Sequence, residues 1–279
     1  MKCLSYEKPR RKRKKPETNR RPNQKTMKGG ENGMKTITTA IIKGGTGKTA
    51  TAAALSQAAA ADGKNVLAID LDPQANLTFA LHAETDRAGA FQLLTGRASA
   101  KEAIQDTVQG VDVIAASPDL ATIRNAPGAA NVLKETLEPV TAEYDFCFID
   151  TPPQMGVLTY SALQAADGLL IPLEAERASI QGLYQILDIA GAVQKSNPGL
   201  TVTGVIVTRY DARPRINRAM MEAIIAAADA CKVPFLGQIR AGVSVREATG
   251  LQISLIKYAK KSKPAQDYLS LYEEIKKNQ

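Results

Sequence analysis

The sequence is poor in the residues that build metal clusters and disulfide frameworks. Its 279 residues include three cysteines, one histidine and no tryptophan. Cys3, Cys147 and Cys231 are too few and too scattered for a disulfide framework, or for the paired cysteines that an iron–sulfur carrier needs. Because His82 is the only histidine, a multi-histidine metal site is excluded as well. These absences favour a protein that is kept reduced in the cytoplasm.

Long apolar runs are missing too. No segment approaches the roughly 20 apolar residues that span a bilayer, and the N-terminus does not resemble a secretory signal. Hydrophobic residues nevertheless make up 44% of the chain, while only 5% of it is aromatic. We therefore expect a cytoplasmic globular protein whose core is built mainly from Ala, Leu, Ile and Val.

Acidic residues are scarce at the N-terminal end. Residues 1–33 hold 12 Lys and Arg against 3 Glu, whereas residues 34–279 hold 24 Lys and Arg against 25 Asp and Glu. The net charge of +8 therefore belongs to the N-terminal segment. Few apolar residues and repelling charges predict a disordered tail over 1–33, either a solvated extension or a non-specific DNA-binding arm. The folded domain is expected over 34–279.

Strand and helix patterns alternate from Thr36 onward. Apolar, β-branched segments predict strands at 36–43, 65–72, 111–117, 146–153, 168–174, 202–209 and 234–240. Helices are expected between them, including an Ala-rich helix over 49–64, a helix after a turn at Pro127–Gly128, and a closing helix over 264–279. This alternation predicts one α/β domain with a doubly wound, mostly parallel sheet and helices on both faces.

A glycine-rich loop, "KGGTGKT" at residues 43–49, stands between the first expected strand and the first expected helix. In that context successive backbone N–H groups can face phosphates, and the helix adds its positive end. Lys48 would reach the β- and γ-phosphates, and the Thr49 hydroxyl would bind Mg²⁺. The sequence thus predicts a P-loop for ATP, formed by Gly44, Gly45, Thr46, Gly47, Lys48, Thr49 and Ala50.

Acidic residues end two of the expected strands. Asp150 ends "FCFID", while Asp70 and Asp72 end "LAIDLD". Open α/β sheets place their ligands beyond the carboxyl ends of the strands, so these carboxylates should lie beside the P-loop. We expect a magnesium site made by Thr49, Asp70 and Asp150, and a carboxylate at the end of the second strand, Asp70 or Asp72, could orient the water that attacks the γ-phosphate.

Together, "KGGTGKT", "DLDPQAN" and "FIDTPP" resemble the deviant Walker A ATPases of the ParA/MinD family, and particularly its ParA/Soj partition proteins. The segments "ADGLLIPLEAERASIQGL" and "VIVTRYDARPRINRAMMEAI" are similar to that family as well. The resemblance covers about residues 34–279. It departs from the common pattern at Ile42, where relatives often have a polar residue or proline, and at Ala50, where a second threonine is common.

The resemblance implies roles for single residues. Lys43 matches the signature lysine, which in the family crosses an ATP-bound dimer interface to the partner's phosphates, so Lys43, Lys48 and Asp72 are the expected catalytic residues. Asp72 matches the acid that positions the hydrolytic water in the family, and Asp70 matches its switch I neighbour. Asp150 matches Walker B. Thr208 and Arg209 fall in the segment that often contacts adenine.

The resemblance also implies partners: a second copy of the chain, non-specific double-stranded DNA, and a ParB-like protein that stimulates hydrolysis. Residues 200–279 carry 13 basic and 7 acidic residues, which fits a DNA-binding face near the nucleoid. The candidate contacts are Arg213, Arg215, Arg218, Arg240, Arg246, Lys257, Lys260, Lys261 and Lys263.

Two other functions stay open. A MinD-like ATPase would cycle on a membrane through an amphipathic C-terminal helix, for which Ala265, Tyr268, Leu269, Tyr272 and Ile275 form one apolar face. Packing of that face on the domain is the interpretation we favour, because the helix is short and its polar side is acidic. A nucleotide-dependent scaffold that barely hydrolyses ATP is the other alternative, and the presence of Asp72 argues against it.

Overall fold

The computed structural model describes residues 33–123 and 130–277. Its elements follow one another in this order: β1 (Lys35–Thr39), α1 (Lys48–Ala61), β2 (Val66–Asp70), α2 (Asn76–Ala80), α3 (Ala90–Leu94), α4 (Ala100–Ala103), β3 (Ile104–Asp106), β4 (Asp112–Ile114), η1 (Pro118–Thr122), α5 (Val132–Leu137), η2 (Glu138–Glu143), β5 (Phe146–Asp150), α6 (Val157–Ala165), β6 (Gly168–Leu173), α7 (Arg177–Val193), β7 (Thr201–Tyr210), α8 (Arg215–Ala230), β8 (Phe235–Arg240), α9 (Ser244–Gly250), α10 (Leu255–Tyr258) and α11 (Lys263–Lys277). The two η elements are 3₁₀ helices.

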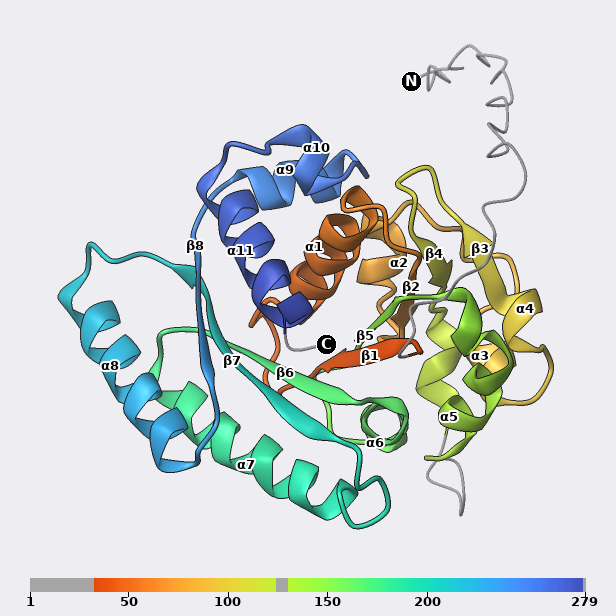
Figure 1. Cartoon of the computed structure of the whole chain (residues 1–279), viewed down its shortest axis with the longest axis horizontal. Coiled ribbons are helices and arrows are strands. Elements are labelled where there is room, and N and C mark those ends of the chain that lie inside the picture. The colour runs from red at the N-terminus through yellow and green to blue at the C-terminus, as the bar shows by residue number, and fades with distance from the viewer. Residues whose placement is uncertain (1–32, 124–129, 278–279) are drawn as a thin grey trace, which may run out of the picture.

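The strands form one eight-stranded sheet in the order β3-β4-β2-β5-β1-β6-β7-β8 (Figure 1). All neighbouring pairs are parallel except β3 and β4, so the predicted mostly parallel sheet is confirmed. β1 lies between β5 and β6. The strand order therefore reverses next to β1, which is where sheets of this kind bind ligands.

Alternation along the central strands divides the core between the two faces of the sheet. In β5, Phe146 and Phe148 contribute to one core cluster, while Cys147 and Ile149 contribute to another. Every residue of β5 is buried, as expected for a strand covered on both sides.

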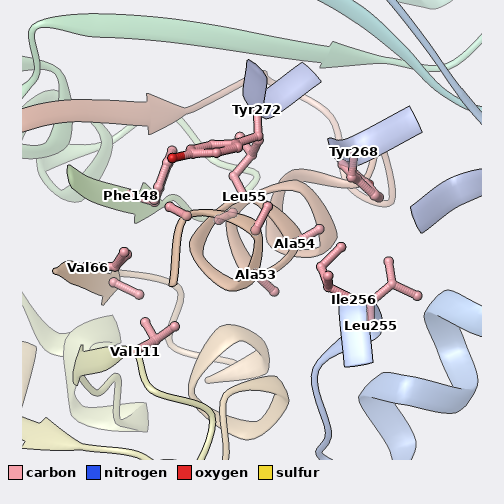
Figure 2. Packing of buried hydrophobic residues seen from close by; sticks show 14 of the residues in the cluster. Ala53, Ala54, Leu55, Val66, Val111, Phe148, Leu255, Ile256, Tyr268 and Tyr272 are labelled. Carbon is pink, nitrogen blue, oxygen red and sulfur yellow. The ribbon is translucent and has the colours of Figure 1, made fainter. Parts of the chain in front are cut away.

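Helices cover both faces of that sheet (Figure 1). α1 and the C-terminal helices α9, α10 and α11 share one core cluster, whereas α7 and α8 belong to a cluster on the opposite face. Figure 2 shows the Ala-rich surface of α1, with Ala53, Ala54 and Leu55, packed among side chains that include Tyr268 and Tyr272. Small side chains on α1 let the neighbouring helices approach it closely.

Several predicted bounds shift. The first strand stops at Thr39, because the chain then turns into the glycine loop. The helix expected after Pro127–Gly128 is a short α5 that continues as 3₁₀ η2. The short elements α2, α3, α4, β3, α9 and α10 were not predicted, since three to seven residues are too few to display a period. The predicted turn at 127–128 and the tail up to residue 32 lie outside the described residues.

The apolar face of α11 is buried. Tyr268, Tyr272 and Ile275 are each at most 4% exposed, and Leu271 completes the face that the sequence assigned partly to Leu269. Packing of this helix on the domain is therefore confirmed. Among the residues that the structure describes, no helix has the length and apolar character to cross a membrane.

Candidate nucleotide site

The glycine loop follows β1 and leads directly into α1, which begins at Lys48 as expected. Gly45 and Gly47 have left-handed φ values of 80° and 86°, which non-glycine residues adopt only with strain. Space is restricted at Gly47 as well, because a Cβ there would lie 3.3 Å from the Thr208 side chain. Thr208 in turn donates from Oγ1 to the backbone oxygen of Thr46 at 2.7 Å. The end of β7 thus fixes the shape of the loop.

Lys48 is held under this loop. Its ammonium is buried and donates to the backbone oxygen of Lys43 at 2.9 Å. Burial lowers the pKa of Lys48, and the nearby carboxylates of Asp150 and Asp72 oppose that shift. An ammonium has three N–H donors, so Lys48 can keep this bond and still donate to a phosphate.

Thr49 and Asp150 form the pair expected of a magnesium site. Thr49 Oγ1 donates to Asp150 Oδ2 at 2.6 Å, and Asp150 is fully buried at the end of β5. The other oxygen, Oδ1, is buried with no hydrogen-bond partner among the described residues. Burial and the charge of Asp70 raise the pKa of Asp150 well above its usual value. A hard cation would supply the missing partner and offset the buried charge, so the residues fit Mg²⁺.

Magnesium usually keeps several waters and takes few protein ligands. In the described part of the chain, no group of three or more His, Cys, Asp or Glu side chains is placed to hold an ion.

Asp70 lies beside Asp150, because β2 and β5 pair with these two residues in register. Its oxygens accept hydrogen bonds from the Asp72 N–H at 3.0 Å and from the Thr78 N–H and Oγ1, both at 2.8 Å. Burial nevertheless raises the pKa of Asp70 to about 6. Both oxygens are already engaged, so this geometry shapes the loop after β2. A direct bond from Asp70 to the metal stays a prediction.

Asp72 lies two residues beyond Asp70, at the wall of a cavity next to the P-loop. It is 8% exposed, and its Oδ1 accepts from the Gln74 N–H at 3.0 Å. This hydrogen bond fixes the carboxylate beside the cavity that Lys48 and Thr49 also line.

That cavity has a volume of about 1010 Å³. It brings together the P-loop, the segment after β2, the end of β7 and the stretch from β8 through α9. The predicted Thr208 and Arg209 both line it. Arg209 has a left-handed φ of 52° and pairs with Glu174 at 3.1 Å. Gln74, Phe79 and several residues between Ile239 and Gly250 also line the cavity, although none was predicted to do so, because they reach it only through the tertiary fold. Two of them, Arg240 and Arg246, were predicted as DNA contacts.

Lys43 faces a different space. It lines a cavity of about 290 Å³ between the start of the loop and α7, together with Ile41, Ile42 and Thr46. Its ammonium forms an ion pair with Glu176, the residue just before α7, and this bond lowers the pKa of Glu176. The two loop lysines therefore point to two separate cavities.

The predicted DNA contacts fall into two groups. Arg213, Arg215 and Arg218 lie at the start of α8, and Arg246 and Lys257 to Lys263 lie on α9 to α11, across the sheet. Two of these arginines form ion pairs within the fold. Arg213 pairs with Asp211 at 2.7 Å, and Arg240 makes a bidentate interaction with the carboxylate of Asp267. Arg240 therefore joins β8 to α11, and a role on DNA for any of these residues stays a prediction.

Comparison with known proteins places these features in context. The sequence model of a family described as "AAA domain" matches residues 34–202. The chain is 36% identical to the "Chromosome-partitioning ATPase Soj" of Thermus thermophilus over 245 residues, which are 87% of this chain and 95% of that protein.

Two solved structures share the fold. One is cobyrinic acid a,c-diamide synthase from Mycobacterium smegmatis with a bound ATP analogue and magnesium, at 30% identity and a TM-score of 0.73 over 86% of this chain and 93% of that one. The other is the septum site-determining protein MinD from Pyrococcus horikoshii with Mg-ADP, at 28% identity and a TM-score of 0.74 over 88% and 97%. The names of these proteins describe different cellular roles, and the feature that the two solved structures share with this chain is the nucleotide-binding fold.

Proposed function

Because the chain belongs to the ParA/MinD family of P-loop ATPases, we propose that it is a DNA-partition ATPase that works as an ATP-dependent dimer. In this proposal the ATP-bound pair binds double-stranded DNA without sequence preference. A ParB-like partner stimulates hydrolysis, after which the pair separates and leaves the DNA. The similarity to a chromosome-partitioning ATPase over most of both chains supports partition as the role.

The observation that carries the proposal is the divergence of the two loop lysines. Lys48 lines the large cavity with Thr49 and Asp72, whereas Lys43 lines the small cavity on the α7 side of the loop. A lysine directed away from its own nucleotide cavity could exchange its ion pair with Glu176 for the phosphates of a second copy. This placement supports the dimer that the sequence motif implies.

Within one copy, ATP would occupy the large cavity with its phosphates over the glycine loop. Lys48 would donate to the β- and γ-phosphates, and Thr49 with Asp150 would hold Mg²⁺. When bound, that ion neutralises charge on the phosphate oxygens. Asp72, fixed by the Gln74 N–H, would accept a hydrogen bond from a water and orient it toward the γ-phosphate.

The DNA surface would be the basic region at the carboxyl edge of the sheet. Lys257, Lys260, Lys261 and Lys263 are all exposed, and no acidic residue lies between Lys257 and Lys263. Lysines in this arrangement release counterions from phosphates without reading bases. This agrees with non-specific binding and would place the protein on the nucleoid.

Removal of the Asp72 carboxylate tests the proposal. The Asp72→Ala variant should bind ATP, stop hydrolysing it and stay on DNA, because the water is no longer oriented. Asp86→Ala is a suitable control, since Asp86 is exposed and remote from the cavity lining. If Asp72→Ala leaves DNA as readily as the nucleotide-free protein does, the assigned role of Asp72 is wrong.

Membrane cycling in the manner of MinD is the second candidate, favoured by the fold shared with that protein. The structure offers it no obvious anchor in the last described helix, because the apolar face of α11 packs on α1 and β8. We therefore rank it below partition.

A further inference from the structure

Three glutamines form a hydrogen-bonded cluster between the nucleotide site and the C-terminal helices. Gln57 lies on α1, Gln109 in the turn between β3 and β4, and Gln252 between α9 and α10. Gln57 and Gln109 are 5% and 7% exposed. Gln57 Nε2 donates to Gln109 Oε1 at 2.8 Å, and Gln109 Nε2 donates to the backbone oxygen of Gln252 at 3.1 Å. We refer to these three residues as the glutamine cluster.

The cluster holds the C-terminal end of α2. The last carbonyls of a helix lack partners within it. Here Gln109 Nε2 donates to the buried Ala80 oxygen at 2.8 Å. Gln252 Nε2 adds an exposed bond at 3.1 Å to the Phe79 oxygen, which also accepts from the His82 N–H. The preceding residue, Thr78, donates to Asp70, which accepts in turn from the Asp72 N–H. α2 therefore links the loop of the catalytic acid to the glutamine cluster.

The cluster also holds the start of α10. Gln57 Oε1 accepts from the Leu255 N–H at 2.9 Å, and Leu255 is the first residue of that helix. Lys257, Lys260, Lys261 and Lys263 follow directly, and α1, α2, α9 and α10 gather on the same side of the molecule (Figure 1). The proposed DNA-binding segment is thus bonded to the helix that follows the P-loop.

We infer that the glutamine cluster couples the nucleotide site to the α9–α10 segment, with Gln109 as the positioning residue that makes α2 and this segment move together. The inference rests on the proposed function. Its physical basis is that a buried amide or carbonyl left without a partner is costly. If α2 shifts when the loop around Asp72 responds to ATP, the cluster stays satisfied only when the segment around Gln252 and Leu255 shifts too.

Replacement of the central amide tests the coupling. Gln109→Met keeps the length of the side chain and removes its donors and its acceptor. Gln105→Met is a matched control, because Gln105 is 4% exposed on the adjacent β3 and bonds only to the backbone of Glu84. For each protein, the affinity for a labelled random-sequence duplex is measured with ATP·Mg²⁺ and with ADP·Mg²⁺.

We expect Gln109→Met to bind ATP normally. The ratio of its DNA affinity with ATP·Mg²⁺ to that with ADP·Mg²⁺ should be smaller than the wild-type ratio by about tenfold or more. Gln105→Met should keep the wild-type ratio. A wild-type ratio in Gln109→Met, or an equal loss in both variants, overturns the inference.

A milder variant guards against misfolding of Gln109→Met. Gln109→Asn keeps an amide at this buried position and shortens it by one methylene, so that it no longer reaches both the Ala80 and the Gln252 oxygens. The ratio should fall here too, and an unchanged ratio overturns the inference. Loss of the ratio in the wild-type protein itself would instead contradict the proposed function.

Hydrogen exchange gives a readout that does not need DNA. ATP should change amide protection over 244–258 in the wild-type chain and in Gln105→Met, but not in Gln109→Met. Identical ATP-induced changes in all three proteins would contradict the coupling.

Discussion

At the scale of single residues, Lys43 and Lys48 have only four residues between them in the loop and serve two different functions. Lys48 is buried under the loop and lines the large cavity, while Lys43 is ion-paired to Glu176 beside α7. A conventional P-loop needs only the first of these lysines. The second one has its own surroundings, which is why we assign it to the neighbouring copy.

Truncation of each lysine should separate these functions. Lys48→Ala should weaken ATP binding by about 100-fold, since it removes a charge-assisted bond to phosphate. Lys43→Ala should bind ATP almost normally but fail to dimerise or to turn over. Fluorescent-nucleotide titration and analytical ultracentrifugation measure the two properties. Equal loss of nucleotide binding in both variants would contradict the division of roles.

The buried carboxylates predict an unusual pH dependence. Burial raises the pKa of Asp70 to about 6, and burial and the charge of Asp70 raise that of Asp150 well above its usual value. A carboxyl group whose pKa is raised in the folded state stabilises the fold at low pH, and this contribution is lost as the pH rises through the folded-state value. The nucleotide-free protein should therefore lose stability as the pH rises from the ordinary Asp pKa of about 4 through the folded-state pKa of Asp70 of about 6, and Asp150 contributes in the same direction.

Asp150→Asn should reduce this pH dependence. Without nucleotide, the variant should be more stable than the wild type at pH 7.5 by on the order of 1 kcal/mol, because it removes a buried charge. With Mg·ADP present, the wild type should be the more stable of the two proteins, since the variant lacks the carboxylate that would hold the Mg²⁺ ion. Denaturant unfolding at pH 5 and 7.5 checks both statements. If the variant is less stable than the wild type at pH 7.5 without ligand, the charge of Asp150 does not destabilise the nucleotide-free protein.

At the scale of secondary-structure elements, the glycine loop depends on one backbone conformation and one close contact. Gly47→Ala should cost about 1–2 kcal/mol from its left-handed φ and should also weaken ATP binding, because the new Cβ meets Thr208. Gly63→Ala is the control: its φ is 80°, but its surroundings are open. It should lose similar stability and keep nucleotide affinity. Equal affinities in the two variants would show that contact with Thr208 does not matter.

The helix α11 belongs to the core. Tyr272 is 1% exposed, packs edge-on against Phe146 and donates to Asp62 at 2.8 Å. Tyr272→Ala should therefore destabilise the fold by about 3–5 kcal/mol. Urea unfolding measures this loss, with Tyr184→Ala on the exposed side of α7 as the control. A loss below about 1 kcal/mol would mean that α11 is not held as described.

The sequence predicts the elements whose chemistry is local. Strand, glycine loop and helix stand together around Lys48, and the acids Asp70, Asp72 and Asp150 end apolar strands, so both their presence and their meeting point could be predicted. The short α2 and α9 could not, because their residues reach the site only through tertiary packing. For the same reason the ion pairs of Lys43 and Arg240 carry no local signal.

At the scale of the whole molecule, the sheet order explains why one edge of the protein gathers the chemistry. β1 lies between β5 and β6, and β2 pairs with β5 on the other side, so the P-loop, Asp150 and Asp70 meet at the carboxyl ends of adjacent strands. The stretch from β8 to α9 lines the same cavity, and α10 and the exposed lysines follow it in the chain. Nucleotide and proposed DNA surface are thus parts of one structural unit.

The central claim is that ATP switches this protein onto DNA. The most direct measurement is binding of the full chain to random-sequence duplex DNA and to vesicles of anionic phospholipid, each without nucleotide, with ADP·Mg²⁺ and with ATP·Mg²⁺. We predict that the protein binds DNA strongly only when ATP·Mg²⁺ is present, and that it binds vesicles in none of the three nucleotide states. Two results would contradict the account: ATP-dependent binding to vesicles without binding to DNA, or a DNA affinity that is the same in all three nucleotide states.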